Sequence, residues 1–219
     1  MSILEIKEVS SRIEKLRTDF QIIRSDPEII EECLVTIDEV DEWKYSKKQY
    51  FTPLPFENEL SGYSRGTLIK KKYDNYEDAI LKGNYGFGFI KAEHRITIAP
   101  APTPNSPLEI SLHSMIADGI RIKHTVHHKR LPKPSELRGI CDFFSIDSQT
   151  KASVGVGDRG AFYAYYYMYD DAGFIDTVRA FSKGWHKEAE YRLHYSPDGE
   201  LLKITVGDSI IWGGGVISS

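Results

Sequence analysis

The densest group of side chains able to do chemistry lies in a short basic stretch near the middle of the chain. It contains three histidines and three cations: His124, His127, His128, Lys129, Arg130 and Lys133. On a strand, His124 and His128 share one face and His127 points to the other. Imidazoles beside cations could cleave a phosphodiester, because that reaction needs a proton shuttle and stabilisation of developing negative charge. In this interpretation the histidines move the proton and Arg130 stabilises the charge.

The same stretch allows other interpretations. The imidazoles could bind a metal ion, although no acidic or cysteine ligand lies close by in sequence, and we expect no metal site. The stretch could also contact a polyanion or an acidic partner. The sequence favours a solvated basic strand end that leads into the proline-containing loop at 131–134.

Tyrosines form a second candidate surface. Seven of the 13 tyrosines lie between residues 163 and 195. In a strand over 161–169, one face would carry Tyr163, Tyr165, Tyr167 and Tyr169. A fully buried strand would use aliphatic residues, because each buried hydroxyl needs a hydrogen-bond partner. Tyrosine is also enriched at protein interfaces. The pattern predicts either a recognition surface or a sheet face covered by helices.

Residues 154–160 contain the spacing G-x-G-x-x-G after a strand-like run. In a dinucleotide site the pyrophosphate sits at the N-terminus of a helix that follows this motif. Residues 161–167 are instead β-forming, so we interpret the motif as a hairpin turn. We expect no cofactor.

The last third of the chain alternates strand-like runs with turn signals. The runs cover residues 151–156, 161–169, 174–181, 189–195, 200–206 and 209–212. Glycine, aspartate and proline mark the connections between them. Because such short connections join antiparallel neighbours, residues 150–219 are predicted to form an antiparallel β-meander.

The first 43 residues are predicted to be helical. From Ile6 to Ile23, apolar residues recur at steps of three and four, which places them on one helical stripe. The sequence Ser-Asp-Pro-Glu at 25–28 then indicates the start of a second helix that continues towards Trp43. A short link between two helices suggests an αα-hairpin that covers one face of the sheet.

Residues 44–149 read as a mixed α/β region with proline-rich loops. We expect a short helix over 76–81, capped by Asn75, and a strand over 87–98. Residues 107–118 fit a helix or a hairpin around Asp118-Gly119. The helix is favoured, because a turn at those two residues would pair apolar with charged side chains on one face.

Together these elements predict a single α+β domain over 1–219. Its C-terminal antiparallel β-meander, of five to six strands, would pack against an N-terminal helical hairpin. The composition is that of an ordinary globular protein, with 41% hydrophobic and 27% charged residues. Cys33 and Cys141 lie in apolar surroundings and are expected to be buried.

The net charge, the apolar runs and the cysteine count indicate which compartment and which partners to expect. The net charge of −4 argues weakly against nucleic acid as the main partner, although binding is possible. We see neither a signal peptide nor an apolar run long enough to span a membrane, and two cysteines are too few for a disulfide framework. A cytoplasmic protein without a membrane partner is therefore expected, and its oligomeric state is left open.

Two functional hypotheses follow. The preferred one is a non-catalytic protein-binding module, such as a bacterial immunity or inhibitor protein that binds a toxin or effector through the aromatic sheet face. The alternative is a small enzyme that acts on nucleic acid or a nucleotide with the His124–His128 cluster.

Overall fold

Strands dominate the fold. The computed structural model describes residues 1–24, 26, 28–101, 103–128 and 136–214. Within these residues, twelve strands form one antiparallel sheet in which each strand pairs with its neighbours in sequence. They are β1 Glu42–Ser46, β2 Tyr85–Ile90, β3 Glu93–Ile98, β4 Leu108–Ile116, β5 Gly119–His127, β6 Glu136–Ser145, β7 Thr150–Gly157, β8 Phe162–Tyr169, β9 Ile175–Ser182, β10 Ala189–Tyr195, β11 Leu201–Val206 and β12 Ser209–Gly213. The helices are α1 Lys7–Ile23, α2 Glu28–Asp38, α3 Glu57–Leu60 and α4 Tyr76–Leu81, with 3₁₀ turns η1 Ile3–Glu5 and η2 Asp158–Gly160.

The predicted fold class, a meander of five to six strands on a helical hairpin, is wrong. The six predicted C-terminal strands do form, as β7 to β12, but they are half of a sheet that begins at β1. Five of the six earlier strands, β2 to β6, fall in the region predicted to be mixed α/β, and β1 begins at Glu42, within the segment predicted to be helical. The protein is therefore mostly sheet, with helices as a minor part.

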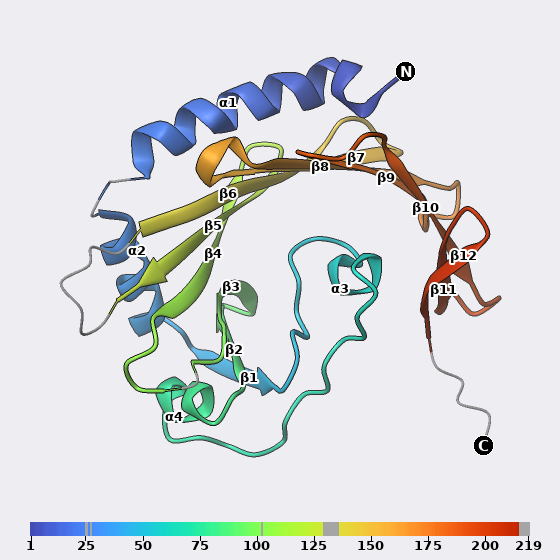
Figure 1. Cartoon of the computed structure of the whole chain (residues 1–219). Coiled ribbons are helices and arrows are strands. Elements are labelled where there is room, and N and C mark those ends of the chain that lie inside the picture. Colours follow the sequence, from blue (N-terminus) through green and yellow to red (C-terminus); the bar gives the residue numbers. More distant parts are fainter. Residues whose placement is uncertain (25, 27, 102, 129–135, 215–219) are drawn as a thin grey trace.

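The sheet curves into an open arch (Figure 1). Helix α1 lies across the outer, convex side, and α2 lies on the outside further down the arch. The chain segment 47–56, here called the inner loop, runs inside the arch and leads into α3. The concave face is thus partly filled by the protein's own chain.

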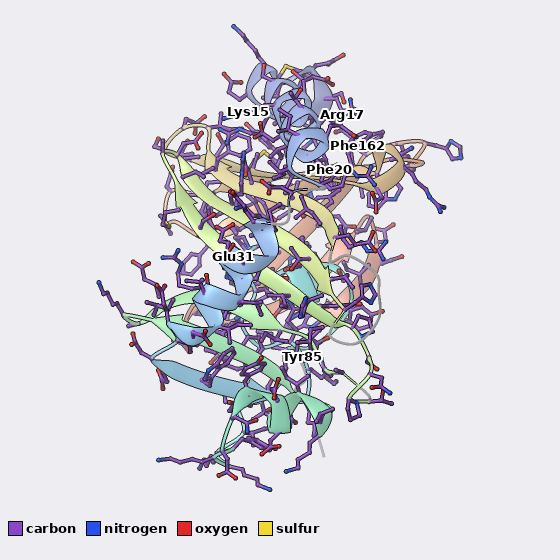
Figure 2. The ribbon with its side chains drawn as sticks, turned by 90° about the vertical axis from the view of Figure 1, so that its left-hand side faces the viewer. Lys15, Arg17, Phe20, Glu31, Tyr85 and Phe162 are labelled. Atoms are coloured by element: carbon purple, nitrogen blue, oxygen red, sulfur yellow. The ribbon has the colours of Figure 1, made fainter. Side chains whose placement is uncertain are left out.

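The predicted helix over residues 6–23 is confirmed as α1. Its buried stripe consists of Val9, Ile13, Leu16 and Phe20. These side chains pack on residues of β6, β7 and β8, and Figure 2 shows Phe20 and Arg17 beside Phe162. The Arg17 guanidinium lies 5.2 Å from the centre of the Phe162 ring, a cation–π contact.

Helix α2 covers a different part of the convex face. Its buried Cys33 and Ile37 pack with Ile96 and Ile110, on β3 and β4. The two N-terminal helices therefore do not form the predicted αα-hairpin, since each helix finds its apolar partner on the sheet. Helix α2 also ends at Asp38, before Trp43, which lies in β1.

The start of α2 agrees in part with the predicted capping. The Asp26 carboxylate accepts a hydrogen bond from the Glu28 N–H, with an N–O distance of 2.9 Å. Ser25 and Pro27, which belong to the same predicted motif, lie outside the described residues.

Residues 108–116 form strand β4, which corrects the predicted helix over 107–118. The hairpin between β4 and β5 turns at residues 117–118 and pairs Ile116 with Gly119. This turn lies one residue earlier than the one considered from the sequence. The register does place an apolar residue beside a charged one, with Leu112 opposite Lys123.

The charged side chains of β5 are accommodated because α1, α2 and β6 bring acids to them. Lys123 donates to Glu32 of α2 over 2.6 Å. Arg121 donates to Asp142 of β6 over 2.7 Å and to Asp19 of α1 over 2.9 Å. The pairing of apolar with charged residues in this hairpin is therefore stabilised by contacts that only the tertiary structure supplies.

The predicted strand over 87–98 is two strands. Lys91 and Ala92 connect β2 to β3 with φ angles of 50° and 66°. Two consecutive positive φ angles are typical of a tight type I′ hairpin turn, which usually uses asparagine or glycine. The turn therefore left no recognisable signal in the sequence. The predicted helix over 76–81 is confirmed as α4, with the Asn75 side chain accepting from the Asp78 N–H over 2.8 Å.

A group of ion pairs joins α1 to the sheet. The Asp142 carboxylate is fully buried and accepts from both Arg12, over 3.0 Å, and Arg121. Arg12 also contacts Asp118 at the β4–β5 turn. Hydrogen bonds to these acids raise the pKa of the Arg121 guanidinium. A buried carboxylate with two arginine partners is satisfied, but it would be costly to leave either arginine unpaired.

Cys33 and Cys141 are both buried, as expected. Burial raises the pKa of the Cys141 thiol to about 12 and also raises that of Cys33, so both are poor nucleophiles. Of the helices in the described part of the chain, none is both long and apolar enough to cross a membrane.

Candidate functional site

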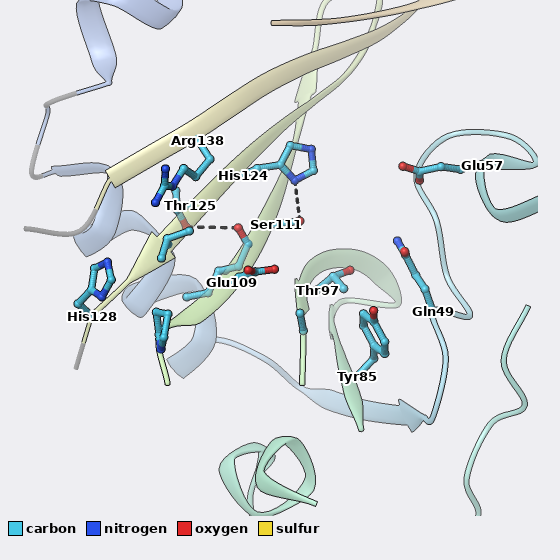
Figure 3. A pocket seen from close by; sticks show the side chains of 14 residues that line it. Gln49, Glu57, Tyr85, Thr97, Glu109, Ser111, His124, Thr125, His128 and Arg138 are labelled. Carbon is cyan, nitrogen blue, oxygen red and sulfur yellow. Dashed lines mark hydrogen bonds between the residues drawn. The ribbon is translucent and has the colours of Figure 1, made fainter. Parts of the chain in front are cut away.

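The main candidate site is a cavity of about 580 Å³ inside the arch. Strands β2 to β5 provide one wall, and the inner loop with α3 provides the other (Figure 3). On β4, Glu109 and Ser111 line the cavity, because they alternate with the apolar residues that pack under α2. The cavity volume lies within the range usual for small-molecule sites.

Ser111 and His124 form a hydrogen bond in the cavity wall. They are paired across β4 and β5, with 2.8 Å between Ser111 Oγ and His124 Nδ1. The His124 ring is exposed to the cavity, yet the protein atoms around it lower its pKa through desolvation. An uncharged imidazole at this place can accept or donate a proton or a hydrogen bond.

Glu57 faces His124 from the opposite wall (Figure 3). It is the first residue of α3 and follows Phe56, whose positive φ of 54° turns the chain into the arch. Burial raises the pKa of the Glu57 carboxyl to about 7. Within the described residues its carboxyl group has no hydrogen-bond or ion-pair partner. A carboxyl group that titrates near neutral pH is characteristic of acid–base and ligand-binding sites.

The described lining is rich in hydrogen-bond acceptors. Glu109, like Glu57, has a carboxylate that faces the cavity, and Gln49 and Tyr85 add polar groups from the inner loop and β2 (Figure 3). Arg138 is the basic residue of this lining, and Glu136 and Asp158 already neutralise it at 2.6 and 3.7 Å. The described lining is therefore more attractive to positive than to negative groups.

The structure places the predicted histidines as follows. His124 and His128 line the same cavity, in agreement with their predicted common face, even though β5 has a bulge between His124 and Thr125. His128 Nδ1 is buried and has no hydrogen-bond partner in the described structure. His127 is not part of this lining and has a partner elsewhere. Arg130 lies outside the described residues.

The four predicted tyrosines, Tyr163, Tyr165, Tyr167 and Tyr169, alternate along β8 and share one face of it. It is the concave face, towards α3, whose Leu60 packs among them. Tyr163 and Tyr165 have ring centres 5.7 Å apart, and Tyr167 is only 1% exposed. Burial raises the pKa of Tyr165 to about 12. The tyrosines thus form much of the inner core of the arch.

The glycine motif at 154–160 belongs to the β7–β8 connection, as predicted. It spans the end of β7 and η2, and a strand, not a helix, follows. Gly155 lies opposite Tyr163, and a Cβ atom there would overlap the tyrosine ring. This glycine therefore makes room for an aromatic side chain.

A second cavity, of about 440 Å³, is lined by Phe51 of the inner loop, by Met115 and by Ile120. Its wall carries His94 and His113, whose ring centres are 4.4 Å apart. Burial lowers the pKa of His94 to about 4 and that of His113 to about 3, so both rings are neutral.

Sequence reasoning missed Glu57, Ser111, His94 and His113. The alternation of Glu109, Ser111 and His113 with apolar residues was available as a strand signal, but the favoured helix obscured it. Nothing local marks Glu57, because its position depends on how the inner loop folds into the arch.

In the described ranges, no group of three or more histidine, cysteine, aspartate or glutamate side chains is arranged to hold a metal ion. Comparisons of the chain with protein-family models, curated proteins and solved structures found no match.

Proposed function

We propose that the protein binds a small polar organic molecule in the cavity between β2–β5 and the inner loop. The observation that carries this proposal is the Glu57 carboxyl group, which has no partner among the described residues and is directed into the cavity opposite the Ser111–His124 pair. Binding sites for small molecules typically combine a concave surface with a few converging polar groups.

The lining favours such a ligand over the nucleic acid or nucleotide of the enzyme hypothesis. Phosphate groups need cationic donors, whereas the described lining offers two carboxylates and one arginine that is already paired. The described residues therefore give the phosphodiester reaction no support.

Capture of a toxin or effector by the tyrosine face stays a prediction. Because Tyr163 to Tyr169 lie on the concave face, a partner would have to enter the arch to reach them. The cavity needs no such entry by a macromolecule, and for this reason it is the preferred site.

The proposal is tested by a binding screen on the purified protein. A library of small amines, polyols, amides and carboxylic acids is tested by ligand-observed NMR, and hits are titrated by calorimetry. The Glu57→Gln and His124→Ala variants should bind these ligands about tenfold or more weakly than wild type, since charge-assisted hydrogen bonds contribute about 1.5–3 kcal/mol. The control is Glu31→Gln, an exposed acid on the outer face of α2 (Figure 2). Hits that bind both cavity variants as well as wild type would refute the proposal.

A second candidate function is acid–base catalysis on the bound molecule. Glu57, with a pKa of about 7, could exchange a proton with a substrate held against His124. If a hit is converted, the rate should change with pH around 7, and Glu57→Gln should abolish that limb of the profile while binding is partly retained. A profile identical in the variant would exclude Glu57 as the acid or base.

A further inference from the structure

Glu57 and Glu109 face the cavity, and neither carboxylate has an ion-pair partner among the described residues, which indicates the charge of the ligand. We infer that the cavity takes a molecule with a primary ammonium group, which sits against Glu57. This inference rests on the proposed function and adds the chemical class of the ligand.

The first feature that indicates a cationic ligand is the environment of Glu57. Glu57 is partly buried, which desolvates its carboxyl group, yet no described cation or donor contacts it. A desolvated carboxylate is unfavourable unless it is paired. A cation that enters the cavity would provide the missing partner and would stabilise the ionised form.

The second feature is the set of hydrogen-bond acceptors around Glu57. An ammonium group has three donors and no acceptor, so it needs several acceptors around it. Glu109 faces the cavity from β4, and the side-chain amide of Gln49 points into it from the inner loop (Figure 3). The Tyr85 side chain of β2, which lines the cavity on the sheet side, adds a hydroxyl oxygen.

Other ligand charges fit less well. An anion would face Glu57 and Glu109, and the Arg138 guanidinium is already paired with Glu136 and Asp158. A neutral polyol could bind the hydroxyl groups but would leave both carboxylates without a counter-charge. The chain's net charge of −4 also favours the approach of cations.

The test compares three molecules with the same four-carbon chain and different charge: 1,4-diaminobutane, 1,4-butanediol and succinate. Each is titrated by calorimetry at about pH 6, where Glu57 is mostly protonated before binding. Titrations in phosphate and in ACES buffer, which differ in ionisation enthalpy, measure the protons released.

We expect the diamine to bind more tightly than the diol and succinate, and to release protons as Glu57 ionises. Glu57→Gln should weaken diamine binding about tenfold or more and remove the proton release, and Glu109→Gln should weaken it less. Glu31→Gln should match wild type.

Three results would overturn the inference. They are preferential binding of succinate or the diol, unchanged diamine affinity in Glu57→Gln, and no diamine binding up to roughly 10 mM. Preferential binding of the diol or succinate that His124→Ala weakens would still support the proposed function, so the failure of the two proposals can be told apart.

Discussion

Gly155 and Tyr163 face each other across β7 and β8 so closely that the glycine position has no room for a side chain. Tyr163 in turn packs against a buried cluster that contains Cys141 and lines the inner side of the arch. The contact couples the glycine motif to the aromatic core.

Gly155→Ala should therefore destabilise the protein by about 1–3 kcal/mol, because overpacking forces the tyrosine ring or the strand to shift. The free energy of unfolding is measured by urea denaturation. Gly213→Ala is the matched control, since a Cβ atom at Gly213 would meet nothing within 4 Å. Equal stability of both variants would mean that the ring moves without cost.

Asp142→Ala should destabilise the protein by about 3–5 kcal/mol, because it leaves the buried ends of Arg12 and Arg121 without a shared partner. Asp118→Ala removes a more exposed partner of Arg12, with 43% of the Asp118 side chain exposed, and should cost about 1 kcal/mol or less. The two denaturation midpoints are compared at neutral pH. If both variants lose a similar free energy of unfolding, Asp142 does not stabilise the fold more than Asp118 does.

Stability should fall when the solution becomes acidic. His94 and His113 have folded-state pKa values of about 4 and about 3, against 6.5 for an ordinary histidine. Below about pH 6.5 the unfolded state therefore binds more protons, and the free energy of unfolding decreases until the folded-state values are reached.

The measurement for these histidines is the free energy of unfolding between pH 7 and about pH 4, in wild type and in His113→Asn. The variant should show a shallower decline with acid. His186→Asn, at an exposed histidine, should keep the wild-type slope. An unchanged slope in His113→Asn would show that this ring is not buried as a neutral group.

Glu57 should act on stability in the opposite direction. Its pKa rises from 4.5 to about 7 on folding, so its contribution is complete below about pH 4.5 and is lost as the pH rises through about 7. Glu57→Gln should consequently gain stability relative to wild type as the pH increases over this interval. Thermal unfolding at several pH values, with Glu31→Gln as control, measures the difference. A difference that does not depend on pH would argue against a raised pKa.

The elements that could be predicted from the sequence are those whose signals are local. The stripe of α1, the Asn75 cap of α4 and the turn-separated strands β7 to β12 were all found in this way. Each depends on periodicity or on capping and turn residues, which act over a few positions.

The elements that were missed depend on distant residues. Strand β4 resembled a helix because Leu108, Leu112, Met115 and Ile116 also fit helical spacing, and the acids that neutralise β5 lie on α1, α2 and β6. The candidate site was predictable only in part. His124 and His128 were identified from the sequence. Glu57 was not, because the path of the inner loop, and not a local sequence signal, brings it opposite His124.

The strict order of the sheet has a consequence for how the protein forms. Since every strand pairs with its neighbours in sequence, most of the pairings join segments that are close along the chain, and such low contact order favours rapid folding. The described lining of the larger cavity falls between residues 49 and 138. During synthesis, the segments that build this cavity would therefore emerge from the ribosome before the last five strands, β8 to β12, emerge.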